Sequence, residues 1–259
     1  MMSPAALRYA LFFLIVYLLM LLVSFPAEQA YRVARQLGPL PVELYGIGGT
    51  SWHGRAQTVR IDGVSLRDFE WTLRPLPLLI GRAEARISLR VGEGTLTGIA
   101  GRTLRGASYA RDVRIDATLA DLGAVAGFGD LGLRGRGAGN LERIRVGSHE
   151  VQVMEGTLTI ADAAIGEPLN MTFGSFVADI ETRDEGVHAA LRDREGPLRA
   201  EGTATLQPAG EWRLRLRLMP RDPADTKTRN MLNSLGRSGA EGQIELTRNG
   251  TLPLDRLIP

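Results

Sequence analysis

The chain has 259 residues, with 31 basic and 29 acidic side chains, so its net charge at pH 7 is only +2. A charge so close to balance gives no electrostatic basis for binding a polyanion, and we predict no nucleic-acid partner. Cysteine is absent. Its absence excludes disulfides, thiol catalysis and thiolate metal sites, and it is compatible with an oxidising compartment.

The N-terminal region contains a long uncharged segment. No charged residue occurs from Tyr9 to Ala27, a run of 19 residues that is almost wholly apolar. As a helix this run would span roughly 28 Å, which matches the hydrocarbon core of a bilayer. A cleaved signal peptide is the alternative, but its apolar region is normally about 7–15 residues and ends in a small-x-small site. A cleavage site after Ala27 would need a small residue two positions earlier, and that residue is Phe25. We therefore expect an uncleaved anchor.

The anchor divides the chain into four expected parts. These are a cytoplasmic tail (1–8), a transmembrane helix (9–27), a periplasmic tether or short helix (28–45) and a periplasmic β-rich domain (46–259). Arg8 lies on one side of the anchor while Arg32 and Arg35 lie on the other, so charge alone sets the orientation weakly. A short tail is easily retained in the cytoplasm, and we therefore predict a single-pass protein of the cell inner membrane.

From about residue 50 the apolar pattern has a period of two, which is typical of strands. The clearest case is 211–218, where the apolar face consists of Trp212, Leu214, Leu216 and Leu218 and the other face of arginines. We take these four as core candidates. Shorter alternating runs separated by Gly, Pro and Asp predict many antiparallel strands. We expect a mainly β fold in which a long, curved antiparallel sheet forms either a sandwich or an open groove.

One helix is expected at 225–235, with Asp222 or Asp225 as its N-cap.

The sequence offers little for catalysis. The three histidines are far apart, and none has a second His at ligand spacing, so we predict no metal site. Its Gly-x-Gly clusters do not join a buried strand to a helix and lack the Gly-Lys-Ser/Thr of a phosphate loop. Acidic pairs lie among arginines in apparent turns, where solvated ion pairs are the ordinary outcome. We therefore predict no catalytic residue, no cofactor and no enzymatic activity.

Two glycine- and tryptophan-containing segments follow the anchor. Residues 49–56 read Gly-Thr-Ser-Trp-His-Gly-Arg-Ala, and residues 71–81 read Trp-Thr-Leu-Arg-Pro-Leu-Pro-Leu-Leu-Ile-Gly. Their content and spacing, distal to an N-terminal anchor, resemble the type II secretion system protein N family. The residues that carry the resemblance are Gly49, Thr50, Trp52, Gly54, Arg55, Ala56, Trp71, Leu73, Pro75, Leu79 and Gly81.

The resemblance implies an accessory inner-membrane component of the type II secretion apparatus. Such a protein would act through periplasmic contacts with other components. Our interaction candidates are therefore the residues that carry the resemblance, except Ala56: Gly49, Thr50, Trp52, Gly54, Arg55, Trp71, Leu73, Pro75, Leu79 and Gly81. The competing interpretation is that Trp52, Trp71 and Trp212 only pack in the hydrophobic core. The alternation of apolar and polar residues predicts core packing without any partner.

A second function is compatible with the same pattern. Alternating apolar residues serve equally in a closed core and in a groove that takes acyl chains. One anchor followed by repeated strands is also similar to envelope lipid-transfer proteins of the AsmA-like group. Lipid is therefore the alternative partner, and lipid binding or bridging the alternative function.

Overall fold

The computed structural model describes residues 4–38, 42–61, 64–104, 106–125, 132–147, 150–167, 170–235 and 243–251. The helices are α1 (Pro4–Val23), α2 (Ala27–Leu37), α3 (Pro75–Leu78), α4 (Leu119–Val125) and α5 (Thr226–Leu235). The first strands are β1 (Val42–Tyr45), β2 (Gly48–Gly49), β3 (His53–Ile61), β4 (Val64–Arg74), β5 (Arg82–Val91), β6 (Gly94–Thr103) and β7 (Ser108–Thr118). The remaining strands are β8 (Leu133–Val146), β9 (Val151–Ile165), β10 (Met171–Arg183), β11 (Gly186–Glu195), β12 (Leu198–Leu206), β13 (Glu211–Pro220) and β14 (Ile244–Thr251).

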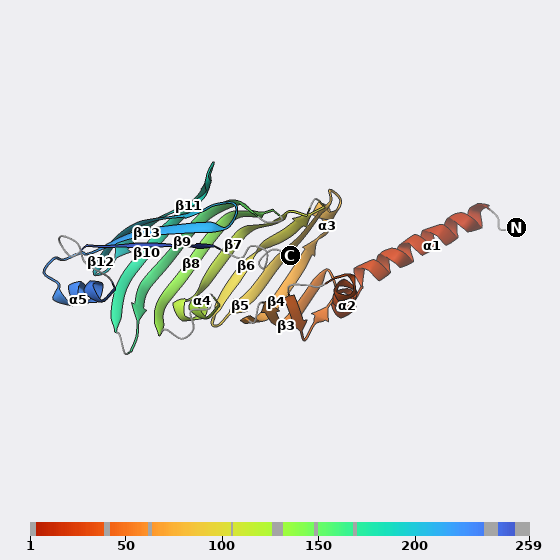
Figure 1. Ribbon diagram of the computed structural model, residues 1–259. Coiled ribbons are helices and arrows are strands. Elements are labelled where there is room, and N and C mark those ends of the chain that lie inside the picture. The colour runs from red at the N-terminus through yellow and green to blue at the C-terminus, as the bar shows by residue number, and fades with distance from the viewer. Residues whose placement is uncertain are drawn as a thin grey trace.

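The described strands all belong to one antiparallel sheet. Its order is β1-β3-β4 and then chain order up to β14, with β2 paired to β3 alone. The protein is therefore mainly β, as predicted, and of the two expected forms it adopts the single open sheet, not the sandwich. Figure 1 shows a long, curved sheet with α1 and α2 at one end and α5 at the other.

Register places apolar and small residues in rows across one face of the sheet. One row runs over ten strands from β5 to β14: Leu89, Leu96, Ile115, Gly139, Leu158, Ala178, Leu191, Gly202, Leu216 and Leu246. A second row runs from β7 to β13: Val113, Leu141, Gly156, Ile180, Ala189, Ala204 and Leu214. The opposite face is charged, with ion pairs such as Arg136 with Asp116 and Arg192 with Asp179.

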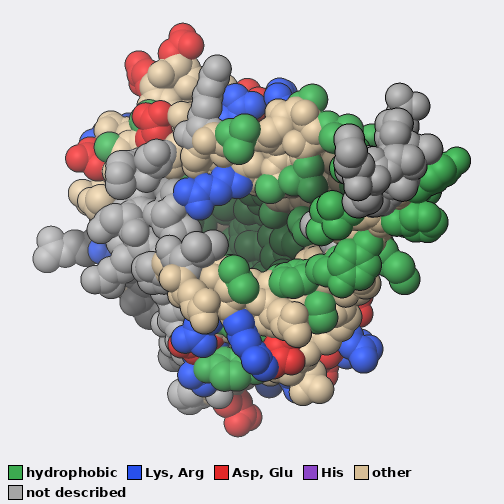
Figure 2. Space-filling model, turned by 90° about the vertical axis from the view of Figure 1, so that its right-hand side faces the viewer, with side chains coloured by type: hydrophobic (Ala, Val, Ile, Leu, Met, Phe, Trp, Pro, Cys, Tyr) green, Lys and Arg blue, Asp and Glu red, His purple; other side chains and the backbone are tan. Residues whose placement is uncertain are grey.

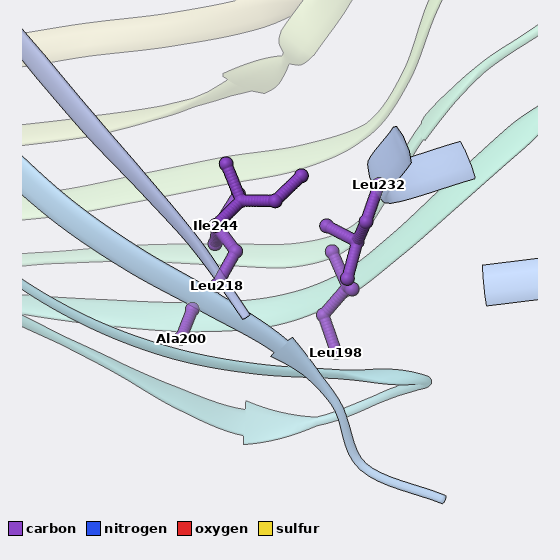
Figure 3. Packing of buried hydrophobic residues seen from close by; sticks show 5 residues of the cluster. All are labelled: Leu198, Ala200, Leu218, Leu232 and Ile244. Carbon is purple, nitrogen blue, oxygen red and sulfur yellow. The ribbon is translucent and has the colours of Figure 1, made fainter. Parts of the chain in front are cut away.

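The buried residues form separate clusters instead of one central core. The first, at the α5 end, consists of Leu198, Ala200, Leu218, Leu232 and Ile244, of which Figure 3 shows the packing. The second consists of Leu89, Val91 and Ala117, and the third of Val151 and Val187. In the longer row Leu89 belongs to the second cluster, and Leu96 and Leu191 pack against the second and the first. Ile115 and Leu158 of the same row are half-buried and belong to none of these clusters. Figure 2, seen from the α1 end, shows a hollow lined by hydrophobic side chains.

Bulges with a left-handed backbone bend the strands. Asp68, Asp112 and Asp162 share a φ of 52°, and each lies where the register shifts. A bulge adds one residue on one strand, which increases the local twist and bends the strand. Asp is among the few residues that tolerate this conformation. These three positions, on β4, β7 and β9, therefore help to curve the sheet around its apolar face.

The N-terminal helices differ in their relation to the sheet. α1 carries many exposed apolar side chains, among them Phe12, Phe13 and Met20, and Figure 1 shows it projecting away from the sheet. Within the described residues, no helix has the length and apolar character needed to cross a membrane. The predicted span 9–27 thus stays a prediction, as does the tail 1–8, of which 1–3 lie outside the described residues.

The segment 28–45, predicted as a tether or helix, contains most of α2 and the edge strand β1. The Tyr31 hydroxyl on α2 donates to the Val42 carbonyl at 3.2 Å and accepts from the Leu44 amide at 3.0 Å. These bonds attach α2 to β1 and so to the sheet. Residues 39–41 lie outside the described residues, as do 252–259 at the end of the predicted β domain.

Candidate interaction site at the α1 end of the sheet

The first motif segment forms a tight turn between β2 and β3. The Thr50 amide donates to the His53 carbonyl at 2.9 Å, and the Thr50 hydroxyl accepts from the His53 amide at 3.1 Å. Gly49 has a φ of 83°, and a Cβ there would lie 2.4 Å from the His53 carbonyl oxygen. Glycine is the residue that fits this position, because a side chain would clash with the closing backbone.

The same turn holds the end of α1. The Ser51 amide donates to the Phe25 carbonyl at 2.8 Å, and Pro26 forms an isolated antiparallel bridge with Thr50. Phe25 is only two residues beyond the end of α1 at Val23. The motif therefore fixes the point at which α1 joins the sheet.

The second motif segment is bonded to the first across β3 and β4. The Leu73 amide donates to the Trp52 carbonyl at 2.8 Å, and the Trp71 indole donates to the Ser51 carbonyl at 3.0 Å. The Trp71 ring covers Gly54 so closely that an added Cβ would lie 2.1 Å from its Cζ2 atom. Phe69 extends this aromatic layer, with its centroid 5.5 Å from that of Trp71.

The predicted interaction residues thus divide by exposure. Trp52 is half-buried, Arg55 is exposed on β3, and Trp71 and Leu73 are half-buried on β4. Arg55 also lines a separate surface pocket of about 840 Å³ together with polar side chains that include Glu70 and Arg90. The exposed Arg55 is therefore available to a partner, while the close contacts of Gly49, Gly54 and Trp71 build the frame of the turn.

The end of the second segment forms an apolar tip. Pro75 begins the single turn α3, and Leu76, Leu79 and Ile80 are 76%, 83% and 70% exposed. Gly81, with a φ of 71°, ends this turn. Its carbonyl accepts from the Leu104 amide at 3.1 Å, which joins the tip to the β6–β7 connection.

A buried carboxylate lies directly behind the tip. Glu84 on β5 is 5% exposed and accepts hydrogen bonds from Arg74 at 2.8 Å, Arg111 at 2.9 Å and Tyr109 at 2.7 Å. Tyr109 reaches it across Gly101, where a Cβ would lie 2.6 Å from the tyrosine ring. Burial raises the pKa of Glu84, but the Tyr109 and Arg111 hydrogen bonds and the two arginine charges outweigh burial and hold that pKa below its ordinary value.

The core candidates on β13 lie far from this site along the sheet. Leu218 is buried in the cluster at the α5 end, and Leu216 packs against it. Trp212 and Leu214 are half-buried, and the Trp212 ring covers Gly250 of β14, where an added Cβ would lie 2.9 Å from the indole. The structure therefore separates the core candidates on β13, which lie towards α5, from the two motif segments at the α1 end.

Sequence reasoning missed Glu84, Tyr109, Arg111 and Leu104 as parts of this end of the sheet. Glu84 stands among alternating residues of an ordinary strand, and its partners are 10 to 27 residues away in the chain. The one available signal was the proline-containing turn sequence that follows Arg74. That signal does not identify a partner for Glu84, because only strand register brings these side chains together.

Comparison with known proteins decides the family. The family model described as "Type II secretion system (T2SS), protein N" matches residues 41–247, which is most of the chain. The chain belongs to the type II secretion system protein N family.

Two relatives agree with this membership. A protein named "Type II secretion system protein N" from Vibrio cholerae is 28% identical over 260 residues, covering 95% of this chain and 99% of the relative. A protein of the same name from Aeromonas hydrophila is 35% identical over 113 residues, covering 41% of this chain and 42% of its own. No solved structure gives a significant match. The family match includes both motif segments and nearly all of the sheet.

Substituting Gly54 by Ala tests whether the frame of this site requires glycine. The added methyl would meet the Trp71 ring, so we expect Gly54→Ala to destabilise the protein by about 1–3 kcal/mol. Gly48→Ala is the matched control, because its Cβ would find no atom nearer than 3.6 Å. Urea unfolding followed by circular dichroism measures both, and equal stabilities for the two variants would contradict the assignment.

Glu84→Gln tests the buried carboxylate. A lowered pKa means that ionised Glu84 stabilises the folded state above the unfolded value of about 4.3, and that this contribution disappears as pH falls through the folded pKa. We expect Glu84→Gln to cost about 1–3 kcal/mol at pH 7 and progressively less as the pH falls from the unfolded pKa through the folded one. The exposed Glu70→Gln on β4 is the control. A loss independent of pH, measured by urea unfolding, would show that charge is not the cause.

Proposed function

We propose that this protein is an accessory component of the type II secretion apparatus, held in the inner membrane by α1, which acts without catalysis through protein contacts in the periplasm. Membership of the family and the names of the two relatives support the role in secretion. The uncharged run 9–27 and the exposed apolar side chains on α1 support the anchor.

The joint between α1 and the sheet is the observation that carries this proposal. Hydrogen bonds from the Ser51 amide to the Phe25 carbonyl and from the Leu73 amide to the Trp52 carbonyl connect the end of α1, the β2–β3 turn and β4. A partner surface built on this joint has a fixed height above the membrane. Confinement to that layer raises its effective concentration for neighbouring envelope proteins, so weak contacts suffice.

The exposed rim of the joint provides the contact surface. His53 and Arg55 are exposed on β3 and Trp52 beside them is half-buried. Aromatic and arginine side chains are enriched where protein interfaces gain most of their energy. The frame residues Gly54 and Trp71 hold this rim in place and need no contact with the partner.

Photo-crosslinking in cells tests the contact. We expect a photoreactive amino acid at position 53 to give adducts with other secretion components, and Trp52→Ala to reduce them while leaving the protein folded. A probe at the exposed Arg217 on β13, far along the sheet, is the control for random collisions. Adducts that persist unchanged in cells without the secretion apparatus would contradict the proposed partner class.

The hollow of the sheet favours lipid binding as a second candidate function. Two rows of apolar and small residues cross the inner face, and no second sheet covers them among the described residues. Large members of the longer row such as Ile115 and Leu158 are only half-buried and lie outside the buried clusters. Because an apolar wall that is not packed by protein favours hydrocarbon over water, acyl chains are the ligand that fits it.

Neighbouring positions on β13 test this second function. Leu214 lies in an apolar row and Arg215 is exposed on the other face. We expect a photoreactive amino acid at 214, but not at 215, to attach to phospholipid in membranes, and phospholipid to co-purify with the protein. Adducts confined to protein residues at both positions would show that the hollow is a closed core in the cell.

A further inference from the structure

The most exposed apolar side chains outside α1 gather at one small tip. Among the large apolar residues that the structure describes outside α1, exposure of 70% or more is found for Leu76 at 76%, Leu79 at 83%, Ile80 at 70% and Leu104 at 89%. Phe13 in the middle of α1, at 68%, is less exposed than any of them. Scattered single apolar residues are normal on protein surfaces, but a group of four is not.

The tip is an ordered structure and not a loose loop. The amides of Leu79, Ile80 and Gly81 donate to the carbonyls of Leu76, Pro77 and Leu78 at 3.0 to 3.2 Å. Leu104 comes from the next hairpin and is joined by its amide to the Gly81 carbonyl. A Cβ at Gly81 would lie 2.5 Å from the Leu104 side chain, so the two connections touch. The backbone thus holds four apolar side chains outward together.

Positive charge surrounds the base of the tip. Arg82 and Arg102 are exposed at the first position of β5 and near the last of β6, where these strands pair. Segments 74–82 and 102–108 contain no acidic residue. Glu84, just behind, is already bonded to Arg74 and Arg111. Segments that enter the headgroup interface of an anionic bilayer have the same arrangement, with apolar side chains outermost and basic side chains behind them.

The tip also lies at the end of the sheet where α1 joins it. Leu73, two residues before Pro75, donates to the Trp52 carbonyl, and Ser51 next to Trp52 donates to the carbonyl of Phe25. Two backbone bonds therefore connect the base of the tip to the residues that follow α1. Figure 1 shows α3 at this same end of the sheet.

We propose that the tip formed by Leu76, Leu79, Ile80 and Leu104 inserts into the membrane interface, with Arg82 and Arg102 placed at the lipid phosphates. The choice of a bilayer over a protein partner depends on the α1 anchor and so rests in part on the proposed function. A second contact beside the anchor fixes the tilt of the sheet relative to the membrane. The expected depth is shallow, about 5–10 Å at the boundary of headgroups and acyl chains.

Site-directed fluorescence tests the insertion, because the chain has no native cysteine. The full chain is reconstituted in phosphatidylcholine vesicles with phosphatidylglycerol, and a polarity-sensitive dye is attached to Leu79→Cys, Phe13→Cys or Arg217→Cys in separate samples. Phe13 reports on α1, and Arg217 is exposed far along the sheet on β13. Quenching by lipids that carry a spin label near the headgroup then measures contact with the shallow part of the bilayer.

We expect a blue-shifted, strongly quenched dye at position 79 and an unquenched one at 217. Replacing Leu76, Ile80 and Leu104 together by Ser should return the dye at 79 to water, and the fold should survive because these side chains are exposed. A dye at 79 that is no more quenched than the one at 217 overturns the proposal and leaves a protein as the occupant of the tip. A quenched dye at 79 together with a dye at 13 whose emission remains that of water supports the tip while contradicting the α1 anchor.

Discussion

A single sheet with one apolar face has to shield that face without a second layer, and the rest of the structure depends on this constraint. In a sandwich the apolar rows would pack against a partner sheet. Here the sheet curves over its own apolar face, and the buried residues form separate clusters, one with Leu232 of α5 and another beside α4. Outside the clusters the longer row is only half-buried, as for Ile115 and Leu158. The hollow is therefore a direct consequence of the topology.

Curvature of this kind places special demands on small residues. In the longer row Gly139 lies beside Ile115 and Leu158, and Gly202 lies beside Leu191 and Leu216. A Cβ at Gly139 would meet the Leu158 side chain at 2.7 Å. Small residues on a concave face leave room for large neighbours as the strands close together, while bulges supply the bend. The glycines at positions 139 and 202 thus have a structural role that is visible only once the register is known.

The sequence predicted the elements better than their association. Alternation over 211–218 predicted β13 and its two faces, and Asp225 caps α5 through the Thr228 amide at 3.2 Å, as expected for that helix. The family that the two motif segments resemble is confirmed by the match over residues 41–247. Two things could not be predicted. The rows across ten strands and the site of Glu84 depend on register between distant residues. The apolar tip at Leu79 has a composition that suits a buried turn equally well, because exposure is a property of the assembled sheet.

The joint, the hollow and the tip all belong to one end of the molecule, and this links the two candidate functions. Figure 2 shows the hollow open towards the α1 end, while α5 packs Leu232 into the cluster at the other end. A sheet held by α1 and by the tip would present this opening to the bilayer and the rim around Trp52 to neighbouring proteins. Protein contact and lipid contact would then use different surfaces, since His53 and Arg55 are exposed on β3 while the apolar rows run from β5 to β14. The two functions do not compete for the same side chains, so support for one does not count against the other.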